Sequence, residues 1–378
     1  MDRRTFLRLS AGTTVAATGW ATWRHDANTP PESLDFEPPA YSVIPVVGDG
    51  RWIWNRPPQN ETGYLEPRPF LLSVGIEMEG VGNTFQVKAT TPVPVACPEQ
   101  KIDEEEVVTQ GCEAQVRQVA PYARQLCLYV PQIVPGQKIV AVARFKLTLY
   151  KQFHGYRREQ FPEEQASPPA EVRRDYLGES PGIQTRSKEV VQLLGQLQEG
   201  TEHPWDLAQR FASWILKNIQ PQIGAYTGVQ TALQTGRGDC QEMAGIFIAL
   251  CRAAGIPARL VWVPDHNWSE FYLTDNQGQG HWLPVHTGCY FWFGWTGAHE
   301  LVIQKGDRIQ VPEKKRLYRL LEDWAQWSGR KPRIRYTAEL TPQPAKAGED
   351  PGPGARKKLA SGEWALVGTH PLDRYARR

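Results

Sequence analysis

The segment from Gly238 to Pro257 carries the strongest local folding signals in this 378-residue chain. Asp239 is a favourable N-cap, and Glu242 follows it by three residues, which is the spacing of a reciprocal capping box. The apolar positions that follow recur at helical spacing: Met243, Phe247, Leu250 and Ala254. Gly255 can adopt the left-handed conformation that closes a helix, and the proline two residues later prevents its continuation. We therefore predict a buried helix whose first residue is Cys240.

A cysteine at the start of a helix has chemistry beyond packing. The N–H groups and the dipole of the first turn favour a thiolate over a thiol, and the same N–H groups can stabilise an oxyanion. Cys251 lies ~16 Å further along the same helix, so we expect it only to pack. Because cysteine is commonly a small buried residue, position alone leaves a nucleophile and a packing residue as equal alternatives for Cys240.

A predicted sheet after this helix brings two histidines together. Residues 258–263, 266–273 and 281–286 have the composition of strands and are separated by turn-forming residues. If Leu273 pairs with His281, His266 lies diagonally from His286 on the same sheet face. Diagonal neighbours are ~7–8 Å apart at Cα, within reach of two imidazoles. The alternative for His266 is an ordinary exposed histidine on a strand.

Three blocks of sequence, in this order, resemble the transglutaminase-like superfamily, which shares the Cys-His-Asp arrangement of papain-like enzymes. They are Gly238-Asp239-Cys240 at the helix start, His266-x-Trp268-x-Glu270, and Trp282-Leu283-Pro284-Val285 before the third position. The resemblance covers about residues 176–307. It implies that Cys240 is the nucleophile and His266 the general base.

The third position departs from the family pattern. The family has an aspartate where this chain has His286, and a neutral His286 can accept a hydrogen bond from His266 but supplies no negative charge. Asp265 is adjacent to His266, so its side chain should point to the opposite face of the sheet. Gln234, six residues before Cys240, is a candidate oxyanion donor, with an ordinary loop glutamine as the alternative.

The rest of the chain predicts an α+β fold of two domains. Residues 29–69 are rich in proline and predict a linker, and alternating apolar residues over 70–156 predict an antiparallel β domain. A charged linker at 157–181 precedes a papain-like or transglutaminase-like core at 182–340, with helices followed by an antiparallel sheet. Residues 341–378 are rich in Pro, Gly, Lys and Arg and predict a disordered basic tail.

Residues 1–28 resemble a twin-arginine export signal. Arg3 and Arg4 precede Phe6-Leu7, and residues 9–23 carry no charge. A spanning helix needs ~20 strongly apolar residues, so this segment predicts no stable membrane span. We expect export to the periplasm or another extracytoplasmic space, with cleavage of the signal left open.

Composition argues against several classes of function. The net charge of +2, from 43 basic and 41 acidic residues, gives no electrostatic argument for a nucleic-acid partner. Six cysteines are too few for a disulfide scaffold, although a bridge between Cys97 and Cys112 could close a short loop. No zinc-like spacing and no phosphate-binding loop is present, so we expect no metal and no small-molecule cofactor.

The family resemblance implies acyl transfer onto Cys240, with a protein or peptide as the substrate. A thioester passed to water would make the chain a peptidase or amidase, which we favour; one passed to an amine would make it a protein-crosslinking transglutaminase. The competing class is an inactive binding module that has lost the charged third residue. Its groove would be lined by the neighbouring tryptophans, Trp262, Trp268, Trp282, Trp292 and Trp295.

Overall fold

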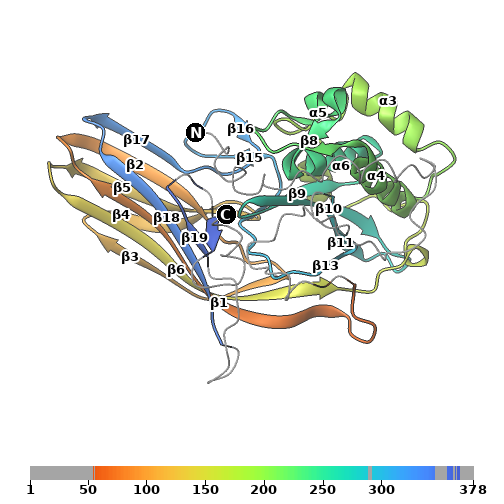
Figure 1. Cartoon of the computed structure of the whole chain (residues 1–378), viewed down its shortest axis with the longest axis horizontal. Coiled ribbons are helices and arrows are strands. Elements are labelled where there is room, and N and C mark those ends of the chain that lie inside the picture. Colours follow the sequence, from red (N-terminus) through yellow and green to blue (C-terminus); the bar gives the residue numbers. More distant parts are fainter. Residues whose placement is uncertain are drawn as a thin grey trace, which may run out of the picture.

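The computed structural model describes residues 54, 56–287, 292–344, 356–360, 362 and 364–366. The expected export signal lies outside these residues, as does most of the proline-rich linker. Figure 1 shows two parts, with long twisted strands on one side and helices packed on shorter strands on the other. This is the α+β arrangement predicted from the sequence.

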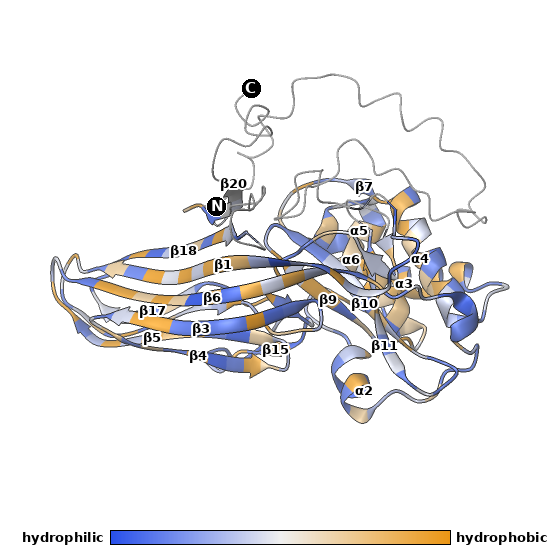
Figure 2. Cartoon of the chain, turned by 90° about the horizontal axis from the view of Figure 1, so that it is seen from below, coloured by the Kyte–Doolittle hydropathy of each residue, from blue (hydrophilic) through white to orange (hydrophobic). Residues whose placement is uncertain are grey.

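The long strands form an antiparallel sandwich. They are β1 (Gly63–Glu79), β2 (Thr84–Val93), β3 (Gln100–Gln110), β4 (Glu113–Ala120), β5 (Ala123–Ile133), β6 (Lys138–Phe153), β17 (Trp324–Gly329) and β18 (Arg333–Pro342). One sheet runs β3-β6-β1-β18 and the other β4-β5-β2-β17. Alternate residues of β1 and β6 are apolar (Figure 2), and these residues fill a core shared with the facing sheet.

The second part packs helices against a short antiparallel sheet. The helices are α2 (Ala170–Tyr176), α3 (Lys188–Leu197), α4 (Pro204–Asn218), α5 (Val229–Thr235) and α6 (Cys240–Ala253), after a 3₁₀ turn, η1 (Arg158–Gln160). The strands are β9 (Ala258–Val263), β10 (His266–Thr274) and β11 (Gly280–His286). Helix α6 lies between the other helices and β10, so every residue from Gln241 to Arg252 is buried.

Short strands connect the two parts. They are β7 (Gln220–Pro221), β8 (Arg237–Gly238), β12 (Trp292–Phe293), β13 (Trp295–Thr296), β14 (Gln304–Lys305), β15 (Ile309–Gln310) and β16 (Leu317–Tyr318). Strand β14 pairs with β9 on one side and with β5 on the other, and β13 pairs with β6. The helical part and the sandwich therefore share continuous sheets.

The predicted domain limits need correction at three places. Strand β1 begins at Gly63, inside the expected linker, and the expected linker at 157–181 contains η1, α2 and the buried Phe161. Strands β17 and β18, expected in the core, complete the sandwich instead. They were misassigned because strand pairing over long sequence separations leaves no local pattern.

The expected disordered tail also contains ordered strands. β19 (Arg356–Lys358) pairs with the edge of β18, and β20 (Trp364–Leu366) pairs with β19. Trp364 is buried against the sandwich core, which gives this polar segment the apolar anchor that composition alone did not indicate. Within the described ranges, no helix is both long and apolar enough to cross a membrane.

Candidate active site

The predicted helix start at Cys240 is confirmed. The Gln241 N–H donates to Asp239 Oδ1 at 2.8 Å, and the Asp239 N–H donates to Glu242 Oε2 at 3.0 Å, which completes the capping box. A Cβ on Gly238 would lie 2.5 Å from the Cβ of Glu242, so this position requires glycine. The helix ends as expected at Gly255, with φ of +80°.

The two cysteines of α6 have different surroundings. Cys240 is half-buried and lines a cavity, whereas Cys251 is fully buried among apolar side chains. Burial raises the pKa of the Cys251 thiol well above its ordinary value, so the thiol stays protonated and unreactive. The five cysteines of the described residues are all free thiols, and Cys97 is therefore not bridged to Cys112.

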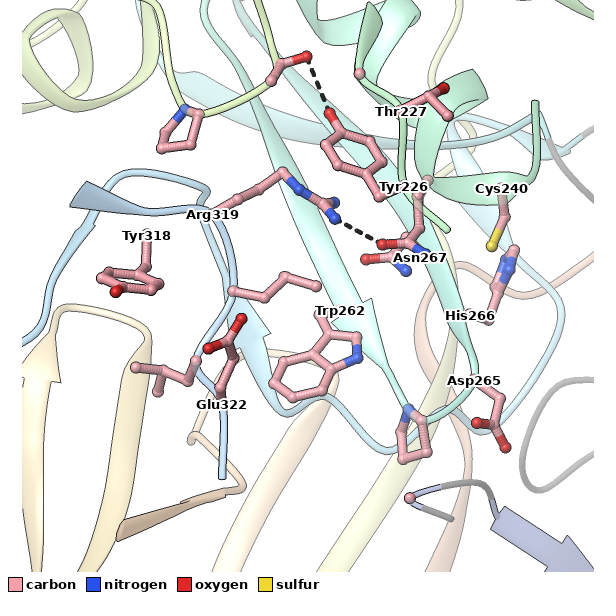
Figure 3. A pocket seen from close by; sticks show the side chains of 18 of the residues that line it. Tyr226, Thr227, Cys240, Trp262, Asp265, His266, Asn267, Tyr318, Arg319 and Glu322 are labelled. Atoms are coloured by element: carbon pink, nitrogen blue, oxygen red, sulfur yellow. Dashed lines mark hydrogen bonds between the residues drawn. The ribbon is translucent and has the colours of Figure 1, made fainter. Parts of the chain in front are cut away.

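The predicted strand register is also confirmed. Leu273 pairs with His281, and Ser269 pairs with Val285, two positions before the end of β11. His266 Nε2 consequently lies 3.4 Å from His286 Nδ1. In Figure 3 the sulfur of Cys240 and the ring of His266 point toward one another at the edge of the cavity that both residues line.

Asp265 takes no part in this contact. It occupies the turn before β10 with φ of +61°, and its Oδ2 accepts a hydrogen bond from the Trp364 N–H at 2.9 Å. Figure 3 shows its carboxylate directed away from Cys240. As predicted from its place next to His266 in the sequence, the Asp265 side chain points away from the site (Figure 3).

Aromatic rings hold the second histidine in place. Trp268 stacks on His286 with the ring centroids 4.8 Å apart and the planes 19° apart, and Trp292 meets the same ring edge-on at 4.8 Å. Burial lowers the pKa of His266 to about 4. Burial, and secondly the neighbouring His266, lower the pKa of His286 well below its ordinary value. Both rings are therefore neutral near pH 7.

A residue that the sequence analysis missed, Glu300, lies behind His286. It is only 4% exposed, and its Oε2 is 3.6 Å from His286 Nε2. Burial raises the pKa of Glu300 well above its ordinary value, Glu99 raises it further, and the Trp268 indole opposes the rise. One signal was available: Glu300 immediately precedes the apolar run Leu301-Val302-Ile303, where an acid would need a partner.

His266, His286 and Glu300 all have side chains of the kinds that bind metal ions. Potential ligand atoms of His266, His286 and Glu300 lie within 4.8 Å of one another. However, His266 approaches Nδ1 of the His286 ring, whereas Glu300 approaches Nε2 of that ring. A zinc ion needs its ligand atoms to converge at ~2.0–2.2 Å on one point. The arrangement fits a linear hydrogen-bonding chain better than a converging ligand set.

The cavity in front of Cys240 has a volume of about 660 Å³. Its walls come from the loop before α5, the start of α6, the turn into β10, residues 318–322 and the C-terminal strands. One wall is fixed by Arg319, which donates to Gln241 Oε1 at 2.6 Å and stacks 3.7 Å from the ring centroid of Tyr226 (Figure 3). The acids Asp265 and Glu322 also line the cavity.

Gln234 is not part of this site. It lies on α5, where its Nε2 donates to Glu189 Oε1 of α3 at 2.6 Å, and it is not among the residues that line the cavity. The proposal of Gln234 as oxyanion donor is therefore corrected: the turn of α5 directs it toward a neighbouring helix. Gln241 and Asn267 are the amide side chains that line the cavity.

The acid of the second sequence block, Glu270, belongs to a buried ion-pair network. It accepts from Arg259 at 2.6 Å and from Lys305 at 2.5 Å, and all three side chains are buried. Burial alone would raise the pKa of Glu270, but the two cations outweigh it and hold the pKa below its ordinary value. This network joins β9, β10 and β14.

The neighbouring tryptophans mostly pack rather than line a groove. Trp268, Trp292 and Trp295 are buried. The guanidinium carbon of Arg259 lies 3.9 Å from the centroid of the Trp282 ring. Of the five tryptophans expected to line a groove, only Trp262 lines the cavity.

Part of this chain is similar to proteins that are already known. Residues 191–287 match the family model described as the transglutaminase-like superfamily. A stretch of 56 residues is 38% identical to peptide-N(4)-(N-acetyl-beta-glucosaminyl)asparagine amidase of Yarrowia lipolytica. This stretch is 15% of the present chain and spans only 16% of that amidase.

Two solved structures are similar in part. A candidate cysteine protease from Cytophaga hutchinsonii is 13% identical with a TM-score of 0.48, over 74% of this chain and 99% of that one. A candidate protease from Parabacteroides distasonis is 12% identical with a TM-score of 0.25, over 60% and 48% of the two chains. The segment matched by the family model contains Cys240, His266 and His286. Residues 191–287 of this chain therefore form a domain of the transglutaminase-like superfamily.

Proposed function

We propose that this protein is a cysteine hydrolase that cleaves peptide or carboxamide bonds through a thioester on Cys240. The observation that carries the proposal is the placement of Cys240, at the capped start of α6, opposite the His266 ring on the wall of one cavity (Figure 3). His286 contacts Nε2 of His266, which leaves Nδ1 for the thiol. Nucleophile, base and orienting group are thus arranged in the order that thiol catalysis requires.

The proposed reaction has two steps. His266 Nδ1 takes the thiol proton, the Cys240 sulfur attacks the carbonyl carbon, and the oxyanion is stabilised by first-turn N–H groups of α6. The C–N bond then breaks, and the departing amine receives the proton from His266. In the second step His266 takes a proton from water, the resulting hydroxide attacks the thioester, and the acid leaves as the proton returns to the Cys240 sulfur.

Water is the acceptor that we favour over an amine. The support is indirect: a stretch of 56 residues of this chain is 38% identical to a Yarrowia lipolytica protein that is named as an amidase. We further propose a protein or peptide substrate and an extracytoplasmic location. The location is supported by the arginine pair and the uncharged segment at the N-terminus of the sequence.

The proposal is tested with purified protein and a set of internally quenched peptides and carboxamides. We expect release of product that is abolished in Cys240→Ala, because no other described thiol lines the cavity. Incorporation of a fluorescent primary amine into a glutamine-bearing protein is measured in parallel. Turnover that survives Cys240→Ala contradicts the proposal, and amine incorporation that exceeds hydrolysis favours the crosslinking alternative.

A further inference from the structure

We propose that Glu300 is a positioning residue that supplies, through His286, the negative charge missing from the third position, and that its ionisation sets the direction of hydrogen bonding along His266 and His286. This inference rests on the proposed function, because it concerns how His266 becomes a base for Cys240. Nothing in the spacing of the motif residues placed Glu300 in the site; only the folded chain brings it there.

The facing polar atoms of His286 and Glu300 lack hydrogen-bond partners in the part of the chain that the structure describes. His286 Nε2 and both carboxylate oxygens of Glu300 are buried, and within the described residues none of these three atoms has a hydrogen-bond partner of ordinary geometry. The Trp268 indole acts on the carboxylate without forming such a bond. His286 Nε2 lies 3.6 Å from Glu300 Oε2. A buried polar atom left unpaired costs ~1–3 kcal/mol, so a short inward movement that closes this contact is favoured. Contacts of this kind are often long in unliganded sites and shorten when substrate binds.

The charge of Glu300 determines which nitrogen atoms of His286 and His266 carry protons. An ionised Glu300 can only accept, so His286 must carry its proton on Nε2 and present a lone pair at Nδ1. His286 Nδ1 then accepts from the Nε2–H of His266, and the lone pair of His266 remains on Nδ1, facing the thiol. This is the tautomer that a general base requires.

A protonated Glu300 reverses every one of these bonds. Its O–H donates to His286 Nε2, so His286 carries its proton on Nδ1 and donates to His266 Nε2. A neutral His266 then carries its own proton on Nδ1, where it cannot take one from Cys240. The Trp268 and Trp292 rings hold the plane of His286 in both states, so the tautomer can change without rotation of the ring.

Several groups packed around Glu300 influence the pH at which its carboxyl group ionises. Glu99, from the segment before β3, and the Trp268 indole of β10 act on Glu300 directly, and His286 of β11 faces its carboxylate. The charge of Glu99 is itself paired with Lys305 of β14 at 2.5 Å. Burial and Glu99 raise the pKa of Glu300, so its carboxyl group titrates at a higher pH than a surface glutamate does.

The test uses alkylation of Cys240 by iodoacetamide as a function of pH, which needs no known substrate. We expect Glu300→Gln to slow alkylation at least about tenfold near neutral pH and to flatten the pH profile, because an amide can hold His286 in either tautomer. Glu300→Asp keeps an ionisable group and should restore part of the rate. The matched control is Asp275→Asn, which removes the carboxylate that contacts His281 at 2.8 Å, near the start of β11.

A second measurement requires no substitution. In protein with ¹⁵N-labelled histidine, His286 should be protonated on Nε2 at the pH where alkylation is fast, and should shift to Nδ1 at lower pH. A wild-type pH profile in Glu300→Gln, or a proton on His286 Nδ1 where alkylation is fast, overturns the inference. If these results are as expected but no substrate is hydrolysed, the proposed function is wrong and the role of Glu300 stands. If hydrolysis depends on Cys240 but not on Glu300, the role of Glu300 is wrong and the proposed function stands.

Discussion

His266 Nε2 and His286 Nδ1 lie 3.4 Å apart on neighbouring strands, and both rings are almost completely buried. His286 is in turn 3.6 Å from the carboxylate of Glu300, so a substitution at His286 also changes the surroundings of a buried acid. This relationship changes what substitution at His286 is expected to do.

Restoring the family aspartate should not restore an ordinary triad. His286→Asp places a second carboxylate beside Glu300 in a buried site, where two like charges cannot both ionise easily. We therefore expect His286→Asp to hydrolyse substrate more slowly than wild type, and the double variant His286→Asp/Glu300→Gln to recover part of the loss. The measurement is kcat/KM for the three proteins. A His286→Asp enzyme that is faster than wild type contradicts the role of Glu300.

Cys240 should be alkylated before Cys251 in the native protein. Cys240 lines the cavity at the start of α6, whereas Cys251 is fully buried and its pKa is raised. Peptide mass spectrometry after brief exposure to iodoacetamide should find the label on Cys240, and unfolding in urea should make Cys251 equally reactive. Equal labelling in the native state would show that Cys240 is not an activated thiol.

The free energy of unfolding should fall as the pH is lowered from about 6.5 to about 4. Burial lowers the pKa of His266 and of His299 to about 4, so over this range the unfolded chain binds protons that the folded chain does not. Each such histidine is expected to cost about 2 kcal/mol at pH 5. Urea unfolding at pH 7 and pH 5 measures the difference.

Glu300 opposes this trend, and its removal provides the control. Because the pKa of Glu300 is raised in the folded chain, this carboxyl group stays protonated above pH ~4.5, where it would ionise in the unfolded chain. The contribution of Glu300 to the free energy of unfolding is therefore present at low pH and is lost as the pH rises through the pKa of the folded state. The loss of stability between pH 7 and pH 5 should therefore be larger in Glu300→Gln. A stability that is independent of pH in both proteins would mean that the histidines are not buried in neutral form.

Glu270→Gln should destabilise the protein by about 3–5 kcal/mol, because it leaves Arg259 and Lys305 buried without their shared carboxylate. Glu79→Gln is the matched control: it breaks an exposed pair with Arg333 and should cost less than about 1 kcal/mol. Urea unfolding of the two variants gives the comparison. Similar costs would indicate that the Glu270 network is not buried in solution.

Gln234→Ala should leave substrate hydrolysis unchanged, because its amide is bound to Glu189 outside the cavity. Gln241→Ala should reduce kcat/KM, since it removes the acceptor that holds Arg319 on the cavity wall. Steady-state kinetics on one peptide substrate separate the two. A larger decrease in kcat/KM for Gln234→Ala than for Gln241→Ala would show that Gln234 contributes to catalysis.

Much of the local structure followed from sequence spacing. The capping box at Asp239 and Glu242 located the first residue of α6, and the register of Leu273 with His281 placed His266 beside His286. These predictions succeeded because the interactions involve residues a few positions apart or strands joined by one short turn. Gln234 was misplaced because its partner, Glu189, belongs to a different helix.

The sequence by itself determined the α+β class, the cysteine at a helix start and the pair of histidines, since capping and alternation are local properties of the chain. The tertiary structure alone decided three further points: that β17 to β20 return to the sandwich, that Arg319 and the C-terminal strands wall the cavity, and that Glu300 stands behind His286. Each depends on contacts between distant segments, which form only when burial of apolar surface brings those segments together and which leave no periodic trace in the sequence.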